Sequence, residues 1–238
     1  DLSGKGDDSE KSSHSLMISF TFLSIFSISD LVPYFFEKMI FSKDFLDNLY
    51  KNNKFNKDYL IEMSNLLGNK FDKIMQQDKK IIVDKNPSNF YWIGFLKLLF
   101  PNSKVIHIKR DLKDISLSVY KNIFGVNEMD WSYSPENITN YIKIYLKTIN
   151  YWKKKYPNFL YEIEYENLIN NKNEETKKLF SFCNIDWSED IFNFYKTGKT
   201  IRTASIYQVK KPIYNSSVNI SEKYSPYLPF LNEIDDLN

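Results

Sequence analysis

The sequence contains few of the residues that build covalent or metal-based frameworks. Its 238 residues include one cysteine, Cys183, and two histidines, His14 and His107. A disulfide needs two cysteines, and structural zinc sites are usually built from several cysteines and histidines. The sequence therefore excludes a disulfide framework and a cysteine-built zinc site. It also disfavours a histidine-rich metal site, so we expect no metal.

Glycine is scarce as well, with six residues in the whole chain. Glycine adopts left-handed backbone conformations without steric cost and lets the backbone approach a ligand closely. Loops that hold a phosphate with their backbone N–H groups rely on both properties. The chain therefore has few positions from which to build a glycine-rich phosphate loop.

Neither sign of charge is in large excess. The chain has 32 Lys and Arg residues against 30 Asp and Glu residues, which gives a formal net charge of +2. This balance excludes a global electrostatic attraction to nucleic acid, although local basic sites are compatible with it. We therefore expect no nucleic-acid partner.

The chain also lacks a long, strongly apolar run. Its uncharged stretch, residues 12–29, is rich in serine and is followed by Asp30. A membrane-spanning helix needs about 20 mostly apolar residues, so we interpret this stretch as a buried core segment and expect no stable membrane span. With one cysteine and no recognisable targeting segment, we expect the cytoplasm, with a Golgi-type lumen as the alternative.

Short apolar runs and amphipathic segments alternate along the rest of the chain. Residues 1–15 are polar and predicted to be frayed, and residues 16–238 are predicted to form one domain. Two or three amphipathic helices are expected within 34–78. A short β-branched run predicts a strand at 81–83, and two further strands are predicted at 104–108 and 159–163. Helical spacing predicts helices at 88–100, 112–122, 136–155, 173–183 and 188–196.

Strands that alternate with helices are typical of an α/β fold with a parallel central sheet flanked by helices. Polar pairs follow each predicted strand: Asp84-Lys85, Lys109-Arg110 and Tyr165-Glu166. In open α/β sheets, ligands bind beyond the carboxyl ends of the strands. Cations at two strand ends, together with the amino end of the helix after Arg110, predict an anionic ligand. His107 lies in mid-strand, on the same side as Val105, and we expect it to be a core residue.

Five motifs follow one another between about residues 80 and 224. They are Asp84-Lys85-Asn86-Pro87, the stretch from Leu99 to Lys104, Lys109-Arg110-Asp111 with Ser118-Val119-Tyr120, Tyr165-Glu166-Asn167-Leu168, and the stretch from Arg202 to Tyr214. In this order they resemble sulfotransferases of the type fused to tetratricopeptide repeats and, more distantly, tyrosylprotein sulfotransferases. The resemblance implies a P-loop-NTPase-like sulfotransferase fold. It also implies transfer of a sulfuryl group from 3′-phosphoadenosine 5′-phosphosulfate to the hydroxyl of a protein tyrosine, a sugar or a small alcohol, so the acceptor partner would be a peptide, a glycan or a small molecule.

The same resemblance assigns roles to individual residues. Arg110 and Ser118 match the pair that holds the donor's 3′-phosphate, and the fork of an arginine suits a phosphate. Lys85 matches the lysine that stabilises charge on the leaving phosphate and the bridging oxygen. Ser205 matches a serine that assists at the transferring sulfonate, and Tyr165 matches a tyrosine near the nucleotide.

Further site residues rest on weaker matches. Gln208 and Lys211 would close over the donor. The loop that cradles the phosphosulfate has one candidate, which includes Lys11 and Ser12 and contains no glycine; a second alignment leaves out both the loop and the strand before it. Asp30 matches the family's glutamate that acts as general base for the acceptor hydroxyl, and helix capping is its alternative role.

Three hypotheses therefore stay open. The first is an active sulfotransferase that needs no metal. The second is a non-catalytic relative that kept the fold and binds nucleotide or a partner, which the degenerate loop favours. The third is a copy of an active enzyme whose amino end is absent from this sequence.

Overall fold

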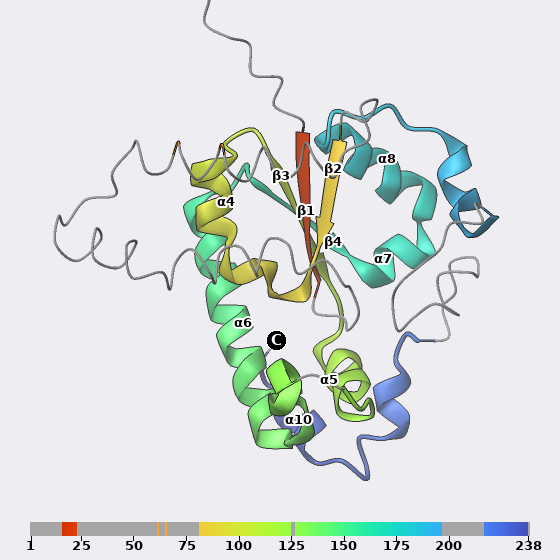
Figure 1. The fold of residues 1–238 in the computed structure, drawn as a ribbon. Helices are drawn as coiled ribbons and strands as arrows, with labels where there is room; N and C mark the ends of the chain where they lie inside the picture. The colour runs from red at the N-terminus through yellow and green to blue at the C-terminus, as the bar shows by residue number, and fades with distance from the viewer. Residues whose placement is uncertain are drawn as a thin grey trace, which may run out of the picture.

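A four-stranded parallel sheet lies at the centre of the part of the chain that the structure describes (Figure 1). The structure is a computed structural model and describes residues 16–22, 61, 65, 81–124, 127–196 and 217–237. The strand order is β2-β1-β3-β4. The strands are β1 (Leu16–Phe22), β2 (Ile81–Lys85), β3 (Lys104–Lys109) and β4 (Leu160–Glu164).

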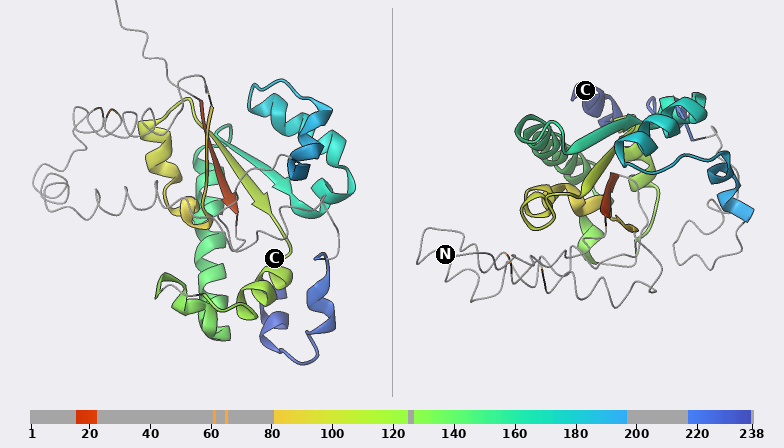
Figure 2. Two further views of the ribbon diagram at one scale, coloured as in Figure 1. Left: turned by 45° about the vertical axis from the view of Figure 1, so that its right-hand side comes forward. Right: turned by 90° about the horizontal axis from the view of Figure 1, so that it is seen from above.

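The register of the sheet brings the strand ends together. Ile18 of β1 lies opposite Val83 of β2 and Lys104 of β3. At the far end, Lys109 of β3 lies opposite Glu164 of β4. Because all four strands run in one direction, their carboxyl ends form one edge of the sheet, which points towards helix α5 (Leu112–Tyr120) (Figure 2).

Helices cover both faces of the sheet (Figures 1 and 2). Helices α4 (Ile93–Leu99) and α6 (Pro135–Lys155) lie on one face, and α7 (Tyr165–Asn170) and α8 (Lys172–Phe182) lie on the other. A hydrophobic core lies on each face of the sheet. Strand β3 contributes side chains to both cores, because successive side chains of a strand point to opposite faces. Val105 packs in the larger core with α4 and α6, whereas Ile106 packs with Cys183 beside α8.

The sequence explains where helix α6 begins, which of its faces is buried and where it ends. Ser134 caps it by accepting from the backbone N–H of Asn137, and Pro135 occupies the first turn. Its buried side chains recur at helical spacing, and each buried isoleucine among them contributes roughly 1.5–3 kcal/mol of hydrophobic stabilisation. Three lysines in the last turn match the negative end of the helix dipole. The buried residues are Ile138, Thr139, Ile142, Tyr145 and Ile149.

The carboxyl-terminal segment packs against α5, beyond the carboxyl edge of the sheet. It contains the 3-10 helix η4 (Ile220–Lys223) and helix α10 (Phe230–Asp235). Leu231 and Ile234 of α10 are fully buried in the larger core. The ring of Phe230 lies edge-on to Tyr120 of α5, with 5.3 Å between centroids. The tail is therefore part of the domain and reaches the edge where the polar residues gather.

The structure confirms the predicted α/β fold with a parallel sheet flanked by helices, and it corrects three details. The alternative without a first strand is wrong, because β1 occupies the centre of the sheet. The predicted helix 88–100 is a 3-10 helix, η1 (Pro87–Tyr91), which Asn86 caps, followed by α4. The predicted helix 188–196 is also a 3-10 helix, η3 (Glu189–Lys196).

Some predictions fall on residues that the structure does not describe. The helices expected within 34–78 lie almost entirely outside the described residues, and the boundary after residue 15 stays a prediction. In the described ranges, no helix has both the length and the apolar character needed to cross a bilayer.

Candidate functional site

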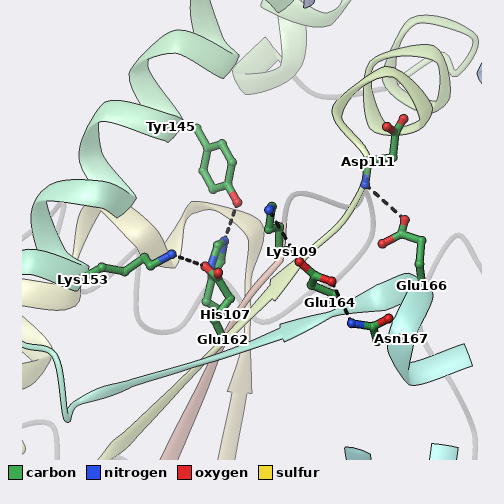
Figure 3. A network of polar contacts seen from close by, with 9 residues as sticks. All are labelled: His107, Lys109, Asp111, Tyr145, Lys153, Glu162, Glu164, Glu166 and Asn167. Carbon is green, nitrogen blue, oxygen red and sulfur yellow. Dashed lines mark hydrogen bonds and ion pairs between the residues drawn. The ribbon is translucent and has the colours of Figure 1, made fainter. Parts of the chain in front are cut away.

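The carboxyl edge of the sheet gathers the polar residues that follow the strands. Lys85 ends β2, Lys109 ends β3, and Glu164 ends β4. Lys109 Nζ and Glu164 Oε1 form an ion pair at 3.7 Å (Figure 3). Both side chains are about half exposed, so this pair contributes little to stability. The predicted meeting of the three strand ends at one edge is confirmed.

Arg110 follows β3 directly and is held on three sides. Its side chain is only 10% exposed. The guanidinium lies over the ring of Tyr165, with 4.9 Å from Cζ to the centroid. Nη2 donates to the carbonyl oxygen of Ser217 at 2.5 Å and lies 3.8 Å from Oδ2 of Asp114. A charge this well enclosed has little freedom to reorient.

Arg110 also keeps a buried donor. Its Nε is buried and makes no hydrogen bond with the described part of the chain. A buried N–H without an acceptor costs about 1–3 kcal/mol, and more on a charged group, so native proteins normally supply a partner. The arrangement therefore suits an anion that accepts from Nε, which is consistent with the expected phosphate.

Asp114, in the first turn of α5, is the site residue that the sequence analysis missed. Its side chain is fully buried. Oδ2 accepts from the backbone N–H of Asn219 at 2.7 Å, and Oδ1 accepts from that of Ser221 at 2.8 Å. Asp114 thus fastens the tail to the helix that follows Arg110. Its spacing of four residues from Arg110 was visible in the sequence, but its partners lie more than 100 positions away.

The start of α7 is fastened to the start of α5. Glu166 Oε1 accepts from the backbone N–H of Asp111 at 3.2 Å (Figure 3). Asn167 Nδ2 donates to Glu164 Oε2 at 2.8 Å. These two bonds flank Tyr165 in the sequence and so hold its ring beside Arg110.

Ser118 lies on α5, eight residues after Arg110, and is partly buried. Its backbone carbonyl accepts from Asn122 Nδ2 at 2.5 Å. The structure therefore brings Arg110 and Tyr165 into direct contact and places Ser118 on the helix that Arg110 precedes. The paired role of Arg110 and Ser118 at one phosphate stays a prediction.

Lys85 lies at the same edge, just before a fixed turn. Asn86 Oδ1 accepts from the backbone N–H of Ser88 at 2.8 Å, and Pro87 begins η1. Burial lowers the pKa of Lys85 below its ordinary value. A partly desolvated ammonium interacts more strongly with an anion than a fully hydrated one does.

Six predicted site residues lie outside the described residues: Asp30, Ser205, Gln208, Lys211, Lys11 and Ser12. Lys11 and Ser12 precede β1, which begins at Leu16, and their role in a phosphosulfate loop stays a prediction.

A buried polar network joins β3, β4 and α6 (Figure 3). His107, which is 2% exposed, donates from Nδ1 to Glu162 Oε2 at 2.8 Å, because a carboxylate can only accept. Its Nε2 contacts the hydroxyl of Tyr145, and Lys153 Nζ donates to Glu162 Oε2 at 2.7 Å. His107 is therefore the expected core residue, with polar partners that the strand pattern did not reveal.

The pKa values of Glu162 and Tyr145 in this network are shifted. The hydrogen bond from His107 lowers the pKa of Glu162 to about 2, assisted by Lys153 and opposed by burial. Burial raises the pKa of Tyr145. No three His, Cys, Asp or Glu side chains among the described residues are grouped so that they could hold a metal ion.

Comparisons with known proteins agree with this geometry. A family model described as the sulfotransferase family matches residues 37–189, more than half of the chain. A protein of Aquifex aeolicus (strain VF5), named only as an uncharacterized protein, is 36% identical over 155 residues, which cover 64% of this chain and 20% of that protein. The chain thus spans about a fifth of the length of this relative.

Two solved structures align with the chain over most of its length. The sulfotransferase domain of the Synechococcus PCC 7002 olefin synthase has a TM-score of 0.57 and 12% identity, and the match covers 93% of each chain. The sulfotransferase domain of the curacin biosynthetic pathway has a TM-score of 0.44 and 13% identity, over 94% of this chain and 96% of that domain. The first of these likenesses supports the sulfotransferase fold.

Proposed function

The chain belongs to the sulfotransferase family, and on that premise we propose that it transfers a sulfuryl group from 3′-phosphoadenosine 5′-phosphosulfate to an acceptor hydroxyl. The observation that carries the proposal is the buried guanidinium of Arg110 at the carboxyl edge of a parallel sheet, whose Nε has no acceptor among the residues that the structure describes. Ligands of α/β proteins bind at this edge, and a buried cationic donor without an acceptor among the described residues is suited to an anion that accepts from it.

The 3′-phosphate is assigned to Arg110. Tyr165 fixes the plane of the guanidinium, and the carbonyl of Ser217 fixes one of its nitrogens, so the remaining donors face a defined direction. Charge-assisted hydrogen bonds from a fork of this kind are among the strongest that proteins make. Ser118 would add a hydroxyl from α5, and the amino end of that nine-residue helix adds a favourable dipole.

Lys85 is proposed to act at the transferring group. When bound, the donor supplies an activated sulfuryl group whose departure leaves charge on the phosphate side. A cation held at the end of β2 and partly desolvated would stabilise that charge as it develops. Its lowered pKa reflects partial burial, and a cation that is already in position needs little reorganisation when the reaction occurs.

The remaining assignments rest on residues outside the described part of the chain. Asp30 is proposed as general base for the acceptor hydroxyl, and Ser205 is proposed to assist at the sulfonate. Gln208 and Lys211 are proposed to cover the bound donor. The acceptor is proposed to be a peptide tyrosine, a sugar or a small alcohol, and the cytoplasm is the proposed compartment.

A non-catalytic nucleotide-binding domain is the second candidate, and one observation favours it. Nη2 of Arg110 already has two partners within the protein, the Ser217 carbonyl and the Asp114 carboxylate. One nitrogen of the guanidinium is therefore already engaged within the protein. Such a site could bind a phosphate without catalysing transfer.

Two measurements separate these candidates. Calorimetric titration with 3′-phosphoadenosine 5′-phosphate, hereafter the bisphosphate, tests whether the chain binds the 3′-phosphate. Adenosine 5′-monophosphate is the matched control because it lacks only that phosphate. We expect the bisphosphate to bind at least tenfold more tightly. Equal affinities would contradict the Arg110 assignment. Transfer of radiolabelled sulfate from the donor to a mixed panel of hydroxyl acceptors then distinguishes an enzyme from a binding domain.

A further inference from the structure

The tail segment 217–221 lies against the amino end of α5, and the backbone carbonyl of Ser217 in this segment accepts a hydrogen bond from Arg110. Resting on the proposed function, we propose that Asp114 is a positioning residue: its carboxylate fixes this segment and thereby aims the Arg110 guanidinium at the nucleotide's 3′-phosphate. Asp114 itself would not touch the nucleotide. It acts through the backbone of the tail.

The first observation concerns the hydrogen bonds that the Asp114 carboxylate accepts. Its two oxygens accept from two backbone N–H groups, those of Asn219 at 2.7 Å and Ser221 at 2.8 Å. The carboxylate is fully buried, and among the described residues these dipoles and the guanidinium of Arg110 at 3.8 Å stabilise its charge. A buried charge with several fixed partners confines each of them, because losing one leaves an uncompensated group.

The second step is the conformation that these bonds hold. Asn219 has φ 57° and ψ 25°, a left-handed conformation that asparagine adopts more readily than most other non-glycine residues. Its N–H is one of the two groups that Asp114 binds, so the carboxylate holds the turn at the residue where the chain changes direction.

The third step leads from the turn to the cation. Ser217 lies two residues before Asn219, and its carbonyl accepts from Nη2 of Arg110. A shift of the turn would therefore move this carbonyl and rotate the guanidinium. The donor that lacks an acceptor, Nε, would rotate with it. Asp114 thus sets the direction in which Arg110 offers its free donor.

The direction in which Asp114→Asn changes the affinity for the nucleotide distinguishes a positioning role from a purely electrostatic one. Asp114 carries a negative charge near the proposed phosphate, so electrostatics alone predicts that Asp114→Asn strengthens anion binding. Positioning predicts the opposite, because the amide presents an NH₂ group to a backbone N–H and loses one of the two bonds. Asp111→Asn is the matched control: it removes a charge from the same end of α5, and asparagine caps a helix as well as aspartate does.

The experiment compares bisphosphate affinities after the wild-type chain has been shown to bind. We expect Asp114→Asn to weaken binding at least tenfold, Asp114→Glu to lose less, and Asp111→Asn to change affinity less than twofold. The affinity for adenosine 5′-monophosphate should change less than twofold in all three. Unchanged or tighter bisphosphate binding by a folded Asp114→Asn variant would overturn the inference and leave the proposed function intact. Absence of binding by the wild-type chain would instead remove the proposed function.

A second measurement uses the wild-type chain, so it does not depend on the folding of a variant. Coupling between sites is reciprocal: if the tail orients Arg110, then a phosphate on Arg110 must stabilise the tail. We expect amide hydrogen exchange at Asn219 and Ser221 to slow at least fivefold when the bisphosphate is bound. Unchanged exchange at both amides, with binding confirmed, would refute the coupling.

Discussion

The guanidinium of Arg110 lies over the ring of Tyr165, with 4.9 Å from Cζ to the ring centroid. The two residues follow β3 and β4, neighbouring strands whose ends are aligned by the register of the sheet. Because the sheet fixes where the two strands end, this contact holds the plane of the buried guanidinium in one orientation. The aromatic face also compensates part of the hydration that the cation has lost.

Replacing the ring of Tyr165 tests this contact. Tyr165→Leu removes the aromatic face, which contributes about 0.5–2 kcal/mol to a cation above it, so we expect roughly 3–30-fold weaker bisphosphate binding. Tyr165→Phe keeps the face and should bind within about twofold of wild type, since the expected contact is with the ring and not the hydroxyl. Equal losses in the two variants, measured by calorimetry, would show that the hydroxyl matters instead.

Lys85→Ala should affect rate far more than binding. The ammonium is proposed to meet charge that develops only in the transition state, so its loss should lower the transfer rate about 10²–10³-fold. Bisphosphate affinity should fall much less, because Arg110 supplies the main grip. Single-turnover transfer of labelled sulfate measures the rate, and calorimetry measures the affinity. Similar losses in both would contradict the transition-state role.

Glu162→Gln should destabilise the fold in a pH-dependent way. The hydrogen bond from His107, assisted by Lys153, lowers the pKa of Glu162 from 4.5 to about 2 in the folded state. The stabilisation is therefore present above about pH 4.5 and is lost as the pH falls towards 2. We expect the variant to lose about 1–2 kcal/mol of unfolding free energy at neutral pH.

Urea unfolding across this pH range measures the effect on Glu162→Gln. The difference from wild type should shrink as the pH falls from 4.5 towards 2, because the wild-type carboxylate becomes protonated. Glu164→Gln is the control, since its ion pair is half exposed and worth little. A difference that stays constant with pH would mean that packing, and not charge, carries the effect.

The strands that carry the site were predictable because their composition is distinctive. Ile81-Ile82-Val83 and the run 104–108 are β-branched, and each is followed by polar residues, which places those residues at one edge of a parallel sheet. β1 was harder to recognise. Its sequence, LMISFTF, lies in an uncharged, serine-rich stretch and lacks the β-branched density of β2 and β3.

The contacts that orient the site could not be read from the sequence. Asp114 binds the backbone of residues 219 and 221, and backbone partners leave no trace in side-chain composition. His107 and Glu162 face each other because β3 pairs with β4 in one particular register. Both relationships depend on how distant segments are placed, and no local pattern encodes that placement.

The central claim is that Arg110 grips the 3′-phosphate of the adenine nucleotide, and the most direct test is calorimetric titration of Arg110→Ala with the bisphosphate. We predict at least a hundredfold loss of affinity in a variant whose circular dichroism matches wild type, with adenosine 5′-monophosphate binding changed less than threefold. Arg110→Lys, which keeps the charge but not the fork, should fall between the two. Bisphosphate affinity that is unchanged in Arg110→Ala would contradict the account.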